Sequence, residues 1–329
     1  MSVLTIKGLN VSFSTEGGDL HALRDVSLDI PKGRIVGIVG ESGCGKSTLI
    51  NAVLGLLANN ARIDRGAILF DGHDLTRLDP KAMRNLRGLR ISTVFQDPMG
   101  ALNPVITVGK QMRNIQYRSD LGAKEKDARS LSMLEQVRIP DAEQALRRFP
   151  HEFSGGMKQR IAIAMALMME PALLIADEPT TALDATLEVA TIDLLKNLQA
   201  GIGCSVLFIS HHLGVIAELC DDVVVMYAGE VVERGATSQV FDRPSHPYTA
   251  RLLECDPARQ AKRTRHLPTI EGDIPDLRRR PPGCIFASRC RLRTCACNEP
   301  PPEIEVDIGH FARCIHAEPH EQNPRNRKS

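Results

Sequence analysis

A glycine-rich segment that ends in a lysine and a serine is the part of this sequence best suited to bind phosphate. It reads GESGCGKS over residues 40–47 and fits the spacing Gly-x-x-x-x-Gly-Lys-Ser/Thr. An apolar, strand-like run precedes it and helix-like spacing follows, so a chance glycine turn is the weaker interpretation. Glycines let backbone N–H groups turn inward around phosphate oxygens, and a following helix adds the positive end of its dipole. The residues expected to bind the nucleotide here are Gly40, Ser42, Gly43, Cys44, Gly45, Lys46, Ser47 and Thr48.

Four side chains have the most specific expected roles around this phosphate loop (residues 40–47). We expect Lys46 to reach the β- and γ-phosphates and the Ser47 hydroxyl to ligate Mg²⁺. Later in the chain, the apolar run LLIADE ends in two acids. Asp177 would meet Mg²⁺ directly or through water, and Glu178 would polarise the attacking water as a general base. Two acids at a strand end are often only a solvated terminus, but the upstream loop favours catalysis. The loop alone would also fit kinases, GTPases and helicases.

The overall composition predicts a folded chain of ordinary charge. Its 329 residues suggest one large domain with an appendage, or two domains. Hydrophobic residues make up 43%, enough for a sizeable core, and the formal net charge of +1 gives no indication of nucleic-acid binding. The first residues lack the layout of a secretory signal, and we find no run of about 18 apolar residues. We therefore expect a soluble protein whose membrane role would come through partners.

The order of apolar runs predicts an α/β fold. Strand-like runs occupy residues 4–13, 21–30, 34–40, 67–75, 172–177, 204–210 and 221–229. Helix-like spacing follows the phosphate loop and dominates from about residue 81 to 169. Short apolar strands separated by helices indicate a parallel sheet that is covered on both faces. After about residue 244 the amino-acid composition changes, and residues 259–293 hold ten Lys or Arg against three Asp or Glu. We interpret this basic stretch as a solvated linker, in preference to an anion-binding site.

Residues 153–160 carry the most specific signal. They read FSGGMKQR and resemble the signature sequence of the ABC ATPases, which separates that family from other phosphate-loop enzymes. They stand shortly before the two acids, as they do in the family. Further family elements occur in the expected order, and the matching residues are Phe13 (adenine stacking), Gln96 (Q-loop), Asp184 after Ala182 and Leu183 (D-loop) and His211 (switch histidine). The alternative for Phe13 is an ordinary core residue of an early strand.

The resemblance implies a fold. It would be an α/β ABC-type nucleotide-binding domain over residues 1–243, followed by a small Cys-rich C-terminal module over residues 244–329. The nucleotide-binding domain would contain a mixed-sheet core, an antiparallel β subdomain and a helical signature subdomain over about residues 98–170.

The resemblance also implies a mechanism. Two such domains would close head to tail, so that Ser154, Gly155 and Gly156 contact the ATP bound by the other subunit. His211 would hydrogen-bond the γ-phosphate, and Gln96 would contact Mg²⁺ and report to the membrane subunits. The chemistry would be in-line phosphoryl transfer to water, in which positioning and charge stabilisation supply most of the rate.

Two residues depart from the generic family pattern. Met157 stands where the signature usually has glutamine, and His212 stands where an aspartate usually follows the switch histidine. Neither departure removes a group expected to act in catalysis, because Glu178 and His211 are both present. The sequence therefore predicts a site that can hydrolyse ATP.

The resemblance narrows, over nearly the whole chain, to the ATPases of dipeptide and oligopeptide importers. The stretches VFQDPMGALNP, IADEPTTALD, VVVMYAGEVVERG and HPYTARLL are very similar to that subfamily. It implies a second, related ATPase subunit, two membrane permease subunits and a periplasmic binding protein, with this chain on the cytoplasmic face of the bacterial inner membrane. Relatives carry nickel, glutathione or sugar derivatives, so the substrate stays open. The alternatives are a soluble ABC ATPase of DNA repair or translation and a purely regulatory nucleotide-binding module.

Four cysteines near the C-terminus have a spacing that could hold a metal group. Cys284, Cys290, Cys297 and Cys314 match the subfamily's four-cysteine pattern, which resembles the binding site of a [4Fe-4S] cluster. Four thiolates also suit structural Zn²⁺, but the tight Cys-x-x-Cys spacing of most zinc sites is absent. Cys295 could replace Cys297 or simply lie near it, and reduced, unligated thiols are the third alternative. A bound metal group would stabilise a region that has little core of its own.

Overall fold

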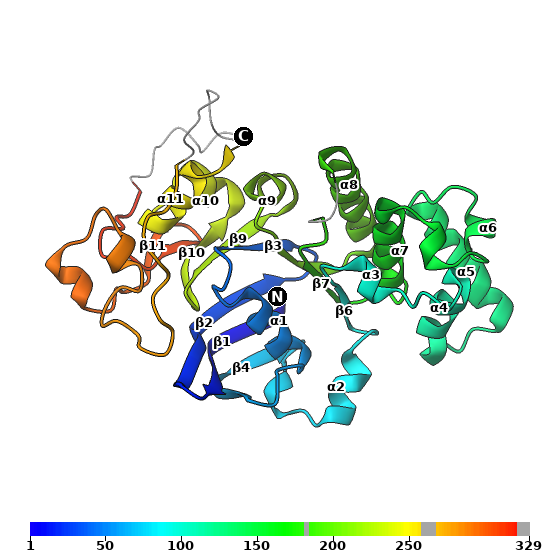
Figure 1. Cartoon of the computed structure of the whole chain (residues 1–329), viewed down its shortest axis with the longest axis horizontal. Coiled ribbons are helices and arrows are strands. Elements are labelled where there is room, and N and C mark those ends of the chain that lie inside the picture. The colour runs from blue at the N-terminus through cyan, green and yellow to red at the C-terminus, as the bar shows by residue number, and fades with distance from the viewer. Residues whose placement is uncertain (181–183, 258–267, 321–329) are drawn as a thin grey trace.

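The computed structural model describes residues 1–180, 184–257 and 268–320. Two sheets organise these residues, one of four strands in the order β2-β1-β4-β5 and one of eight in the order β11-β12-β10-β9-β3-β8-β7-β6. In Figure 1 a group of helices, α4 to α7, lies to the right of both sheets. Residues 268–320, called the C-terminal residues below, lie to the left. The α/β prediction with a mixed sheet is therefore confirmed.

The smaller sheet is antiparallel and comes from the N-terminal part of the chain. Its strands are β1 (Ser2–Thr15), β2 (Gly18–Pro31), β4 (Ala61–Phe70) and β5 (His73–Asp74). In β1, Leu4 and Ile6 are buried whereas Lys7 is exposed, which is the alternation that a strand with one face on the core requires.

The larger sheet has a parallel centre and an antiparallel edge. The parallel strands are β3 (Ile35–Val39), β6 (Ile91–Val94), β7 (Leu173–Asp177), β8 (Ser205–Ile209) and β9 (Asp222–Tyr227). The antiparallel strands are β10 (Glu230–Ala236), β11 (Ile304–Asp307) and β12 (His310–Ala312). Because the central strands are parallel, the loops that follow them meet at one edge of the sheet, where open α/β sheets bind their ligands.

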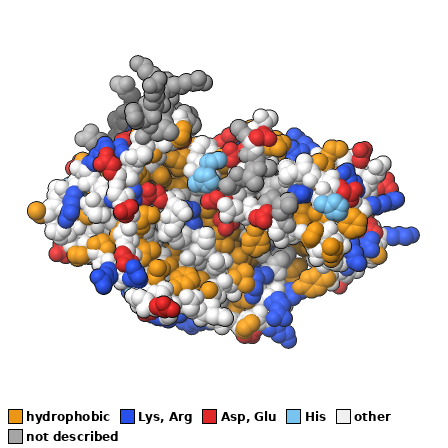
Figure 2. Space-filling view, in the orientation of Figure 1, with side chains coloured by type: hydrophobic (Ala, Val, Ile, Leu, Met, Phe, Trp, Pro, Cys, Tyr) orange, Lys and Arg blue, Asp and Glu red, His pale blue; other side chains and the backbone are white. Residues whose placement is uncertain are grey.

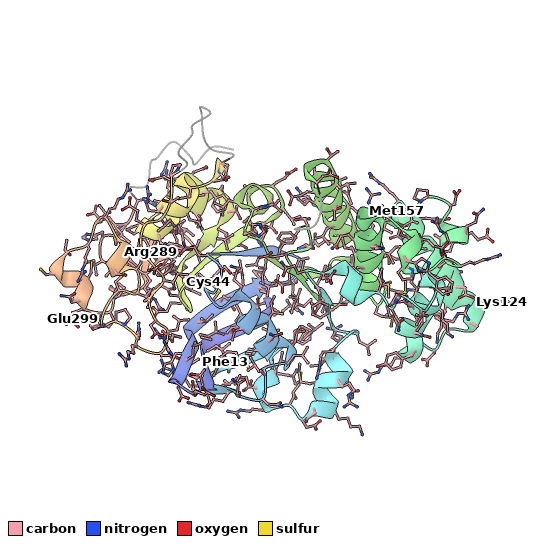
Figure 3. The ribbon with its side chains drawn as sticks, viewed as in Figure 1. Phe13, Cys44, Lys124, Met157, Arg289 and Glu299 are labelled. Atoms are coloured by element: carbon pink, nitrogen blue, oxygen red, sulfur yellow. The ribbon has the colours of Figure 1, made fainter. Side chains whose placement is uncertain are left out.

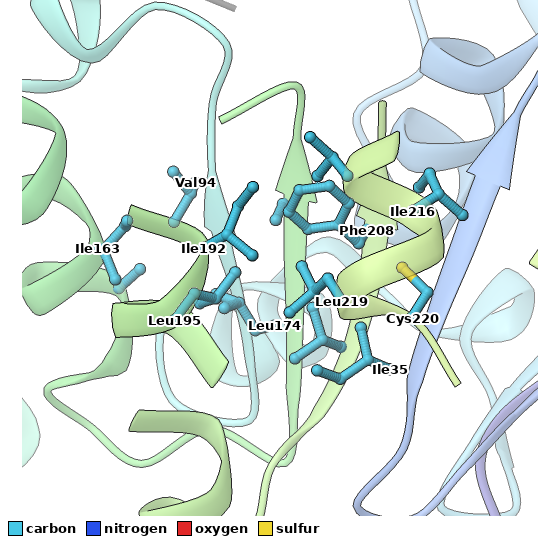
Figure 4. Close-up of a cluster of buried hydrophobic side chains, with 14 of the residues drawn as sticks. Ile35, Val94, Ile163, Leu174, Ile192, Leu195, Phe208, Ile216, Leu219 and Cys220 are labelled. Carbon is cyan, nitrogen blue, oxygen red and sulfur yellow. The ribbon is translucent and has the colours of Figure 1, made fainter. Parts of the chain in front are cut away.

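Alternate residues of the central strands enter two separate hydrophobic cores. In β8, Val206 and Phe208 belong to one cluster and Leu207 and Ile209 belong to the other. All four are fully buried, so the sheet is covered on both faces, as its continuous apolar runs predicted. Figure 4 shows the first cluster, where Phe208 lies beside helix α9 (Leu213–Leu219).

The helices fall into groups along the chain. Those that pack against the main sheet are α1 (Lys46–Leu54), α8 (Ala185–Ile202) and α9. Those of the helical group and its approach are α2 (Pro80–Leu86), α3 (Pro98–Ala101), α4 (Val108–Ile115), α5 (Ala123–Gln136), α6 (Ala142–Ala145) and α7 (Gly155–Leu167). Those before the C-terminal residues are α10 (Thr237–Asp242) and α11 (Pro247–Glu254). Short 3-10 turns are η1 (Leu75–Arg77), η2 (Gln116–Arg118), η3 (Pro150–Glu152), η5 (Ala287–Arg289) and η6 (Cys295–Asn298).

The part of the chain that the structure describes includes no membrane-spanning helix, and its visible face carries charge of both signs. Among the described residues, no helix is both long and apolar enough to cross a bilayer. Figure 2 shows basic and acidic side chains interspersed over the visible face, in keeping with the formal net charge of +1. Part of the basic stretch, residues 259–267, lies outside the described ranges.

The structure does not support a separate Cys-rich module at the C-terminus. β12 pairs with β10, with Phe311 opposite Arg234, so β11 and β12 extend the main sheet. Phe286 is buried, and its ring lies 5.1 Å from the ring of Tyr227 in β9. The C-terminal residues therefore share the core of the nucleotide-binding fold, because pairing and packing over long sequence distances override the local change in composition. The domain limits 1–243, 244–329 and about 98–170 stay predictions.

A buried histidine holds the start of α11 in this region. His246 is 1% exposed, and its Nδ1 accepts a hydrogen bond from the Tyr248 backbone N–H at 3.0 Å. Burial lowers the pKa of the imidazole to about 4, despite the opposing influence of Glu233. His246 is therefore neutral in the folded protein at neutral pH.

This lowered pKa predicts a pH-dependent stability. The unfolded chain binds a proton at His246 near pH 6.5 and the folded chain only near pH 4, so the free energy of unfolding falls as the pH drops through that window. Between pH 7 and 5 the contribution of His246 is about 2 kcal/mol. Urea unfolding of wild type and His246→Asn at both pH values measures it, since asparagine keeps a cap but cannot be protonated. Equal losses of stability on acidification in the two proteins would contradict this assignment.

Candidate functional site

The phosphate loop (residues 40–47) leaves the main sheet at the centre of its carboxyl edge. β3 lies between β8 and β9 and is buried at every residue, and the loop joins its end to α1. Gly40 has φ 154°, and a Cβ there would lie 2.1 Å from the Met226 carbonyl oxygen. Gly45 has φ 103°, and a Cβ there would lie 2.9 Å from the Ala22 carbonyl oxygen. Both positions therefore require glycine, which explains their place in the motif.

Lys46 points back into the loop. The residue is only 9% exposed, and Nζ donates to the carbonyl oxygens of Gly40 at 2.7 Å and Glu41 at 3.1 Å. The ammonium group is thus fixed inside the turn of the loop. Cys44 is also buried, and burial raises the pKa of its thiol, so this residue can offer a ligand only its backbone.

One cavity of about 890 Å³ connects the loop with the other expected site residues. Its lining includes Phe13, Gly40, Ser42, Gly43, Gly45, Lys46, Ser47, Thr48, Gln96, Glu178 and His211. The cavity has the size of a site for a small ligand. These residues come from five separate stretches of the sequence, and the structure brings them to one place.

Two polar side chains contact one carboxylate, that of Glu178, at the edge of the sheet. Gln96, Glu178 and His211 each follow the end of β6, β7 or β8, which are neighbouring parallel strands. The Gln96 amide nitrogen Nε2 donates to Glu178 Oε2 at 3.1 Å, and His211 Nδ1 lies 3.3 Å from the same oxygen. Glu178 takes a φ of 45°, a left-handed conformation that is uncommon outside glycine and asparagine. The backbone is therefore strained at the residue expected to activate water.

Asp177 lies one residue earlier, at the end of β7. Burial raises the pKa of this carboxyl and the charge of Glu178 raises it further, while Lys46 acts in the opposite direction. Unlike Glu178, Asp177 is not among the described residues that line the cavity. A cation that bound beside it would stabilise its ionised form.

The other end of the cavity is apolar. Phe13, half-buried, lines it together with Leu20 and with Leu277 from the C-terminal residues. The Leu277 carbonyl oxygen accepts hydrogen bonds from the His21 N–H at 3.2 Å and Arg24 Nη2 at 2.8 Å, which hold it against β2. Sequence reasoning missed Leu277, because no local pattern places a residue 253 positions away beside Arg24. Thr15 and Asn60 also line the cavity and were not predicted.

The signature residues lie away from the cavity of their own chain. Ser154 caps α7, with its hydroxyl accepting from the Met157 N–H at 3.4 Å. Figure 3 shows Met157 on α7, across the molecule from Phe13 and Cys44. Met157 packs against the large hydrophobic cluster, so the departure from glutamine serves the core. Gly155 has open space around it, and Gly156 faces the Leu187 side chain.

Asp184 caps the following helix. Its carboxylate accepts from the N–H groups of Thr186 at 3.1 Å and Leu187 at 3.0 Å, which begins α8. The adjoining residues Ala182 and Leu183 lie outside the described ranges, so the D-loop as a whole stays a prediction.

His212 pairs with a carboxylate, that of Glu188, which an aspartate at this position would repel. Its Nδ1 lies 3.1 Å from Glu188 Oε1, which also accepts from the Thr180 hydroxyl at 2.7 Å. The His212 ring lies edge-on to the ring of His211, with centroids 4.3 Å apart. An aspartate at this position would put two carboxylates side by side, so His212 and Glu188 suit one another in this chain.

The four predicted cysteines line one small pocket beside His246 and Phe286. Burial raises the pKa of the Cys284 thiol to about 11, and the nearby thiols add to the shift. Cys295 is exposed and does not line this pocket. Within residues 1–180, 184–257 and 268–320, however, no group of three or more His, Cys, Asp or Glu is arranged so that it could hold a metal ion. The structure therefore supports the gathering of the four thiols and does not itself support the expected metal group.

Comparisons with known proteins show the family of this chain. Residues 23–181 match the family model described as ABC transporter, and residues 232–297 match the one described as oligopeptide/dipeptide transporter, C-terminal region. The chain is 48% identical to a dipeptide transport ATP-binding protein of Bacillus subtilis, over 95% of this chain and 94% of that one. It is 44% identical to a probable D,D-dipeptide transport ATP-binding protein of Escherichia coli, over 91% of this chain and 92% of that one.

Solved structures share the fold. A dimeric ATP-binding cassette bound to ADP and phosphate in a post-hydrolysis state superposes with a TM-score of 0.63, at 28% identity over 71% of this chain and 98% of that one. A second structure, cbiO1 of a Clostridium perfringens ABC transporter complex, gives a TM-score of 0.65 at 31% identity, over 74% of this chain and 91% of that one. The aligned portion leaves part of this chain uncovered in both cases.

Proposed function

This chain belongs to the ABC transporter family, among the dipeptide and oligopeptide transport ATP-binding proteins, and from that premise we propose that it energises an importer of di- or oligopeptides. It is an ATPase. The observation that carries the proposal is that one cavity is lined by the phosphate loop, Gln96, Glu178 and His211, in a chain that matches a dipeptide transport ATP-binding protein over nearly its full length. Related importers of nickel, glutathione or sugar derivatives would use the same machinery.

We assign the chemistry to residues at the carboxyl edge of the main sheet. Lys46 and the backbone of the phosphate loop hold the β- and γ-phosphates, while Phe13 stacks on the base. Glu178 takes a proton from the attacking water, and His211 and Gln96 orient this carboxylate, which they already contact. Mg²⁺ would neutralise phosphate charge when bound. The Ser47 hydroxyl, the Asp177 carboxylate and the Gln96 amide offer the oxygen ligands that this ion prefers.

We propose that a complete site needs two chains. Ser154, Gly155 and Gly156 are separated from the cavity of their own chain, so they would serve the ATP bound by a second ATPase subunit. The start of α7 offers N–H groups and a helix dipole to that γ-phosphate. The partner is a related sister subunit or a second copy of this chain.

An apolar groove is the proposed contact with the membrane subunits. It lies between β6, α4 and α7, and it contains two strongly exposed large side chains, Phe95 at 49% and Leu56 at 45%. Exposed apolar surface of this kind is typical of interaction sites. Phe95 in this groove directly precedes Gln96, whose amide donates to Glu178, so a docked permease would lie close to the catalytic carboxylate. The assembly would place this chain on the cytoplasmic face of the inner membrane, with a periplasmic protein delivering the peptide.

For the four-cysteine pocket we propose a [4Fe-4S] cluster with a structural role. The donor set supports it, because Cys284, Cys290, Cys297 and Cys314 line a single pocket. A structural Zn²⁺ held by the same thiolates is the alternative, although most zinc sites use a tighter Cys-x-x-Cys spacing than this chain has. A [4Fe-4S] cluster would take one thiolate at each iron.

Metal and sulfide analysis of anaerobically purified protein tests this cluster. We expect about four iron and four acid-labile sulfide per chain. Cys290→Ser should lose both, whereas Cys295→Ser, the matched control outside the pocket, should keep both. Zinc without sulfide would refute the cluster, and protein without either would favour free thiols.

Purification of the complex from membranes tests the transport function. A tag on this chain should co-purify two integral membrane proteins, and the complex should release phosphate from Mg²⁺-ATP faster when peptide-loaded binding protein is added. Stable association with ribosomes or DNA, without membrane proteins, would overturn the proposal in favour of a soluble ABC ATPase.

A further inference from the structure

A nearly buried arginine from the C-terminal residues contacts the phosphate loop. The Arg289 side chain is only 5% exposed, and its guanidinium donates to both carboxylate oxygens of Glu41, at 2.7 and 3.1 Å. It also donates to the Tyr227 hydroxyl at 3.2 Å. Figure 3 labels Arg289 and, in the phosphate loop, Cys44. This two-pronged geometry is the strongest kind of charged hydrogen bond.

Glu41 is the second residue of the phosphate loop and is held from three sides. Its N–H donates to the Tyr248 hydroxyl at 2.9 Å, and its carbonyl oxygen accepts from Lys46 Nζ at 3.1 Å. Its side chain meets Arg289. Because Glu41 contacts Lys46, a shift of Glu41 would also shift the ammonium group that is expected to bind phosphate.

Arg289 is itself anchored in the C-terminal residues. It donates to the carbonyl oxygens of Ile270 at 2.8 Å and Glu271 at 3.0 Å. It ends η5, directly before Cys290, which lines the four-cysteine pocket. The guanidinium is thus held by backbone carbonyl oxygens of the C-terminal residues and at the same time donates to the Glu41 carboxylate.

We propose that Arg289 is a positioning residue for ATP binding, which acts by fixing and neutralising Glu41 in the phosphate loop. The inference rests on the proposed ATP-hydrolysing function. Without Arg289, the Glu41 carboxylate, which is 26% exposed, would be an uncompensated charge within the loop that is proposed to bind the triphosphate. A half-buried negative charge there would repel phosphate and draw Lys46 toward itself. The C-terminal residues therefore contribute to the ATP site of their own chain.

The test compares ATP kinetics in the purified transporter complex. Arg289→Gln should raise the KM for ATP about tenfold while kcat stays within about threefold, the pattern of lost binding before the chemical step. Adding Glu41→Gln removes the uncompensated charge and should return KM to within about threefold of wild type. A merely structural role would give no such rescue.

Arg280→Gln is the matched control. Arg280 comes from the same stretch and pairs with the core residue Glu230 at 2.8 Å, but Glu230 is not in the phosphate loop. Arg280→Gln should therefore lower the melting temperature of the protein without raising the KM for ATP. Equal KM for Arg289→Gln and Arg280→Gln, or no rescue by Glu41→Gln, would overturn the proposal.

Two further measurements keep the test decisive. If Arg289→Gln does not fold, Arg289→Lys retains the charge but not the paired hydrogen bonds, and it should show a smaller rise in KM. Wild-type KM in Arg289→Lys would refute the positioning role of the paired hydrogen bonds. Titration of the wild-type protein with a fluorescent ATP analogue tests the ATPase function separately from the role of Arg289. Absence of binding in the wild type would refute the ATPase function, whatever the Arg289 variants show.

Discussion

Glu178→Gln should leave nucleotide binding intact and slow ATP turnover by at least about a hundredfold, the scale of losing a general base. Glutamine keeps the shape of the side chain and an oxygen acceptor for Gln96 and His211, but it cannot accept a proton from water. The contacts of Glu178 Oε2 with both residues place it where an attacking water would be oriented. Phosphate release by the assembled complex, measured at saturating ATP, gives the turnover.

Glu188→Gln is the matched control for this variant. Glu188 also contacts a histidine, His212, but it does not line the nucleotide cavity. We expect turnover within roughly threefold of wild type for this control, since partly exposed pairs contribute little. Turnover at the wild-type level in Glu178→Gln, or equal losses in both variants, would refute the assignment of the base.

Lys46→Ala should act one step earlier and weaken nucleotide binding itself. The variant removes charged hydrogen bonds to phosphate and also the contacts of Nζ with the Gly40 and Glu41 carbonyls that close the loop. Losing a charged hydrogen bond costs about 1.5–3 kcal/mol, so the Kd for ATP should rise about ten- to a hundredfold. Direct titration with a fluorescent nucleotide measures it.

A surface lysine provides the control for this second prediction. Lys32 is 64% exposed at the side chain and pairs with Asp71 at 3.6 Å, outside the cavity. Lys32→Ala should bind nucleotide as wild type does. An unchanged Kd in Lys46→Ala would remove the central residue from the proposed site. Lys46→Ala tests nucleotide binding and Glu178→Gln tests the chemical step, so the two variants together separate binding from hydrolysis.

Those parts of the fold and site that local sequence encodes could be predicted. The strand–loop–helix around residues 40–47 needs glycine at Gly40 and Gly45 for steric reasons that leave a visible motif. The convergence of Gln96, Glu178 and His211 follows from their common place after neighbouring parallel strands. Each of these residues is identified by its immediate neighbours in the chain.

The parts that depend on long-range packing could not be predicted. Arg289 and Glu41 are 248 residues apart, and neither carries a signal for the other. Leu277 enters the nucleotide cavity only because its backbone is hydrogen-bonded to β2. The cysteine spacing suggested an independent module, whereas Phe286 and the pairing of β12 with β10 join this region to the main core. Tertiary contacts of this kind depend on the whole chain.

Uptake of a radiolabelled dipeptide tests the central claim most directly. Membrane vesicles that contain the complete transporter, with ATP on the side of this chain and binding protein on the other, should accumulate the peptide. Accumulation should stop when this chain carries Glu178→Gln and should persist with Glu188→Gln. Accumulation that continues at the wild-type rate without ATP, or with Glu178→Gln in this chain, would contradict its role as the ATPase that drives import.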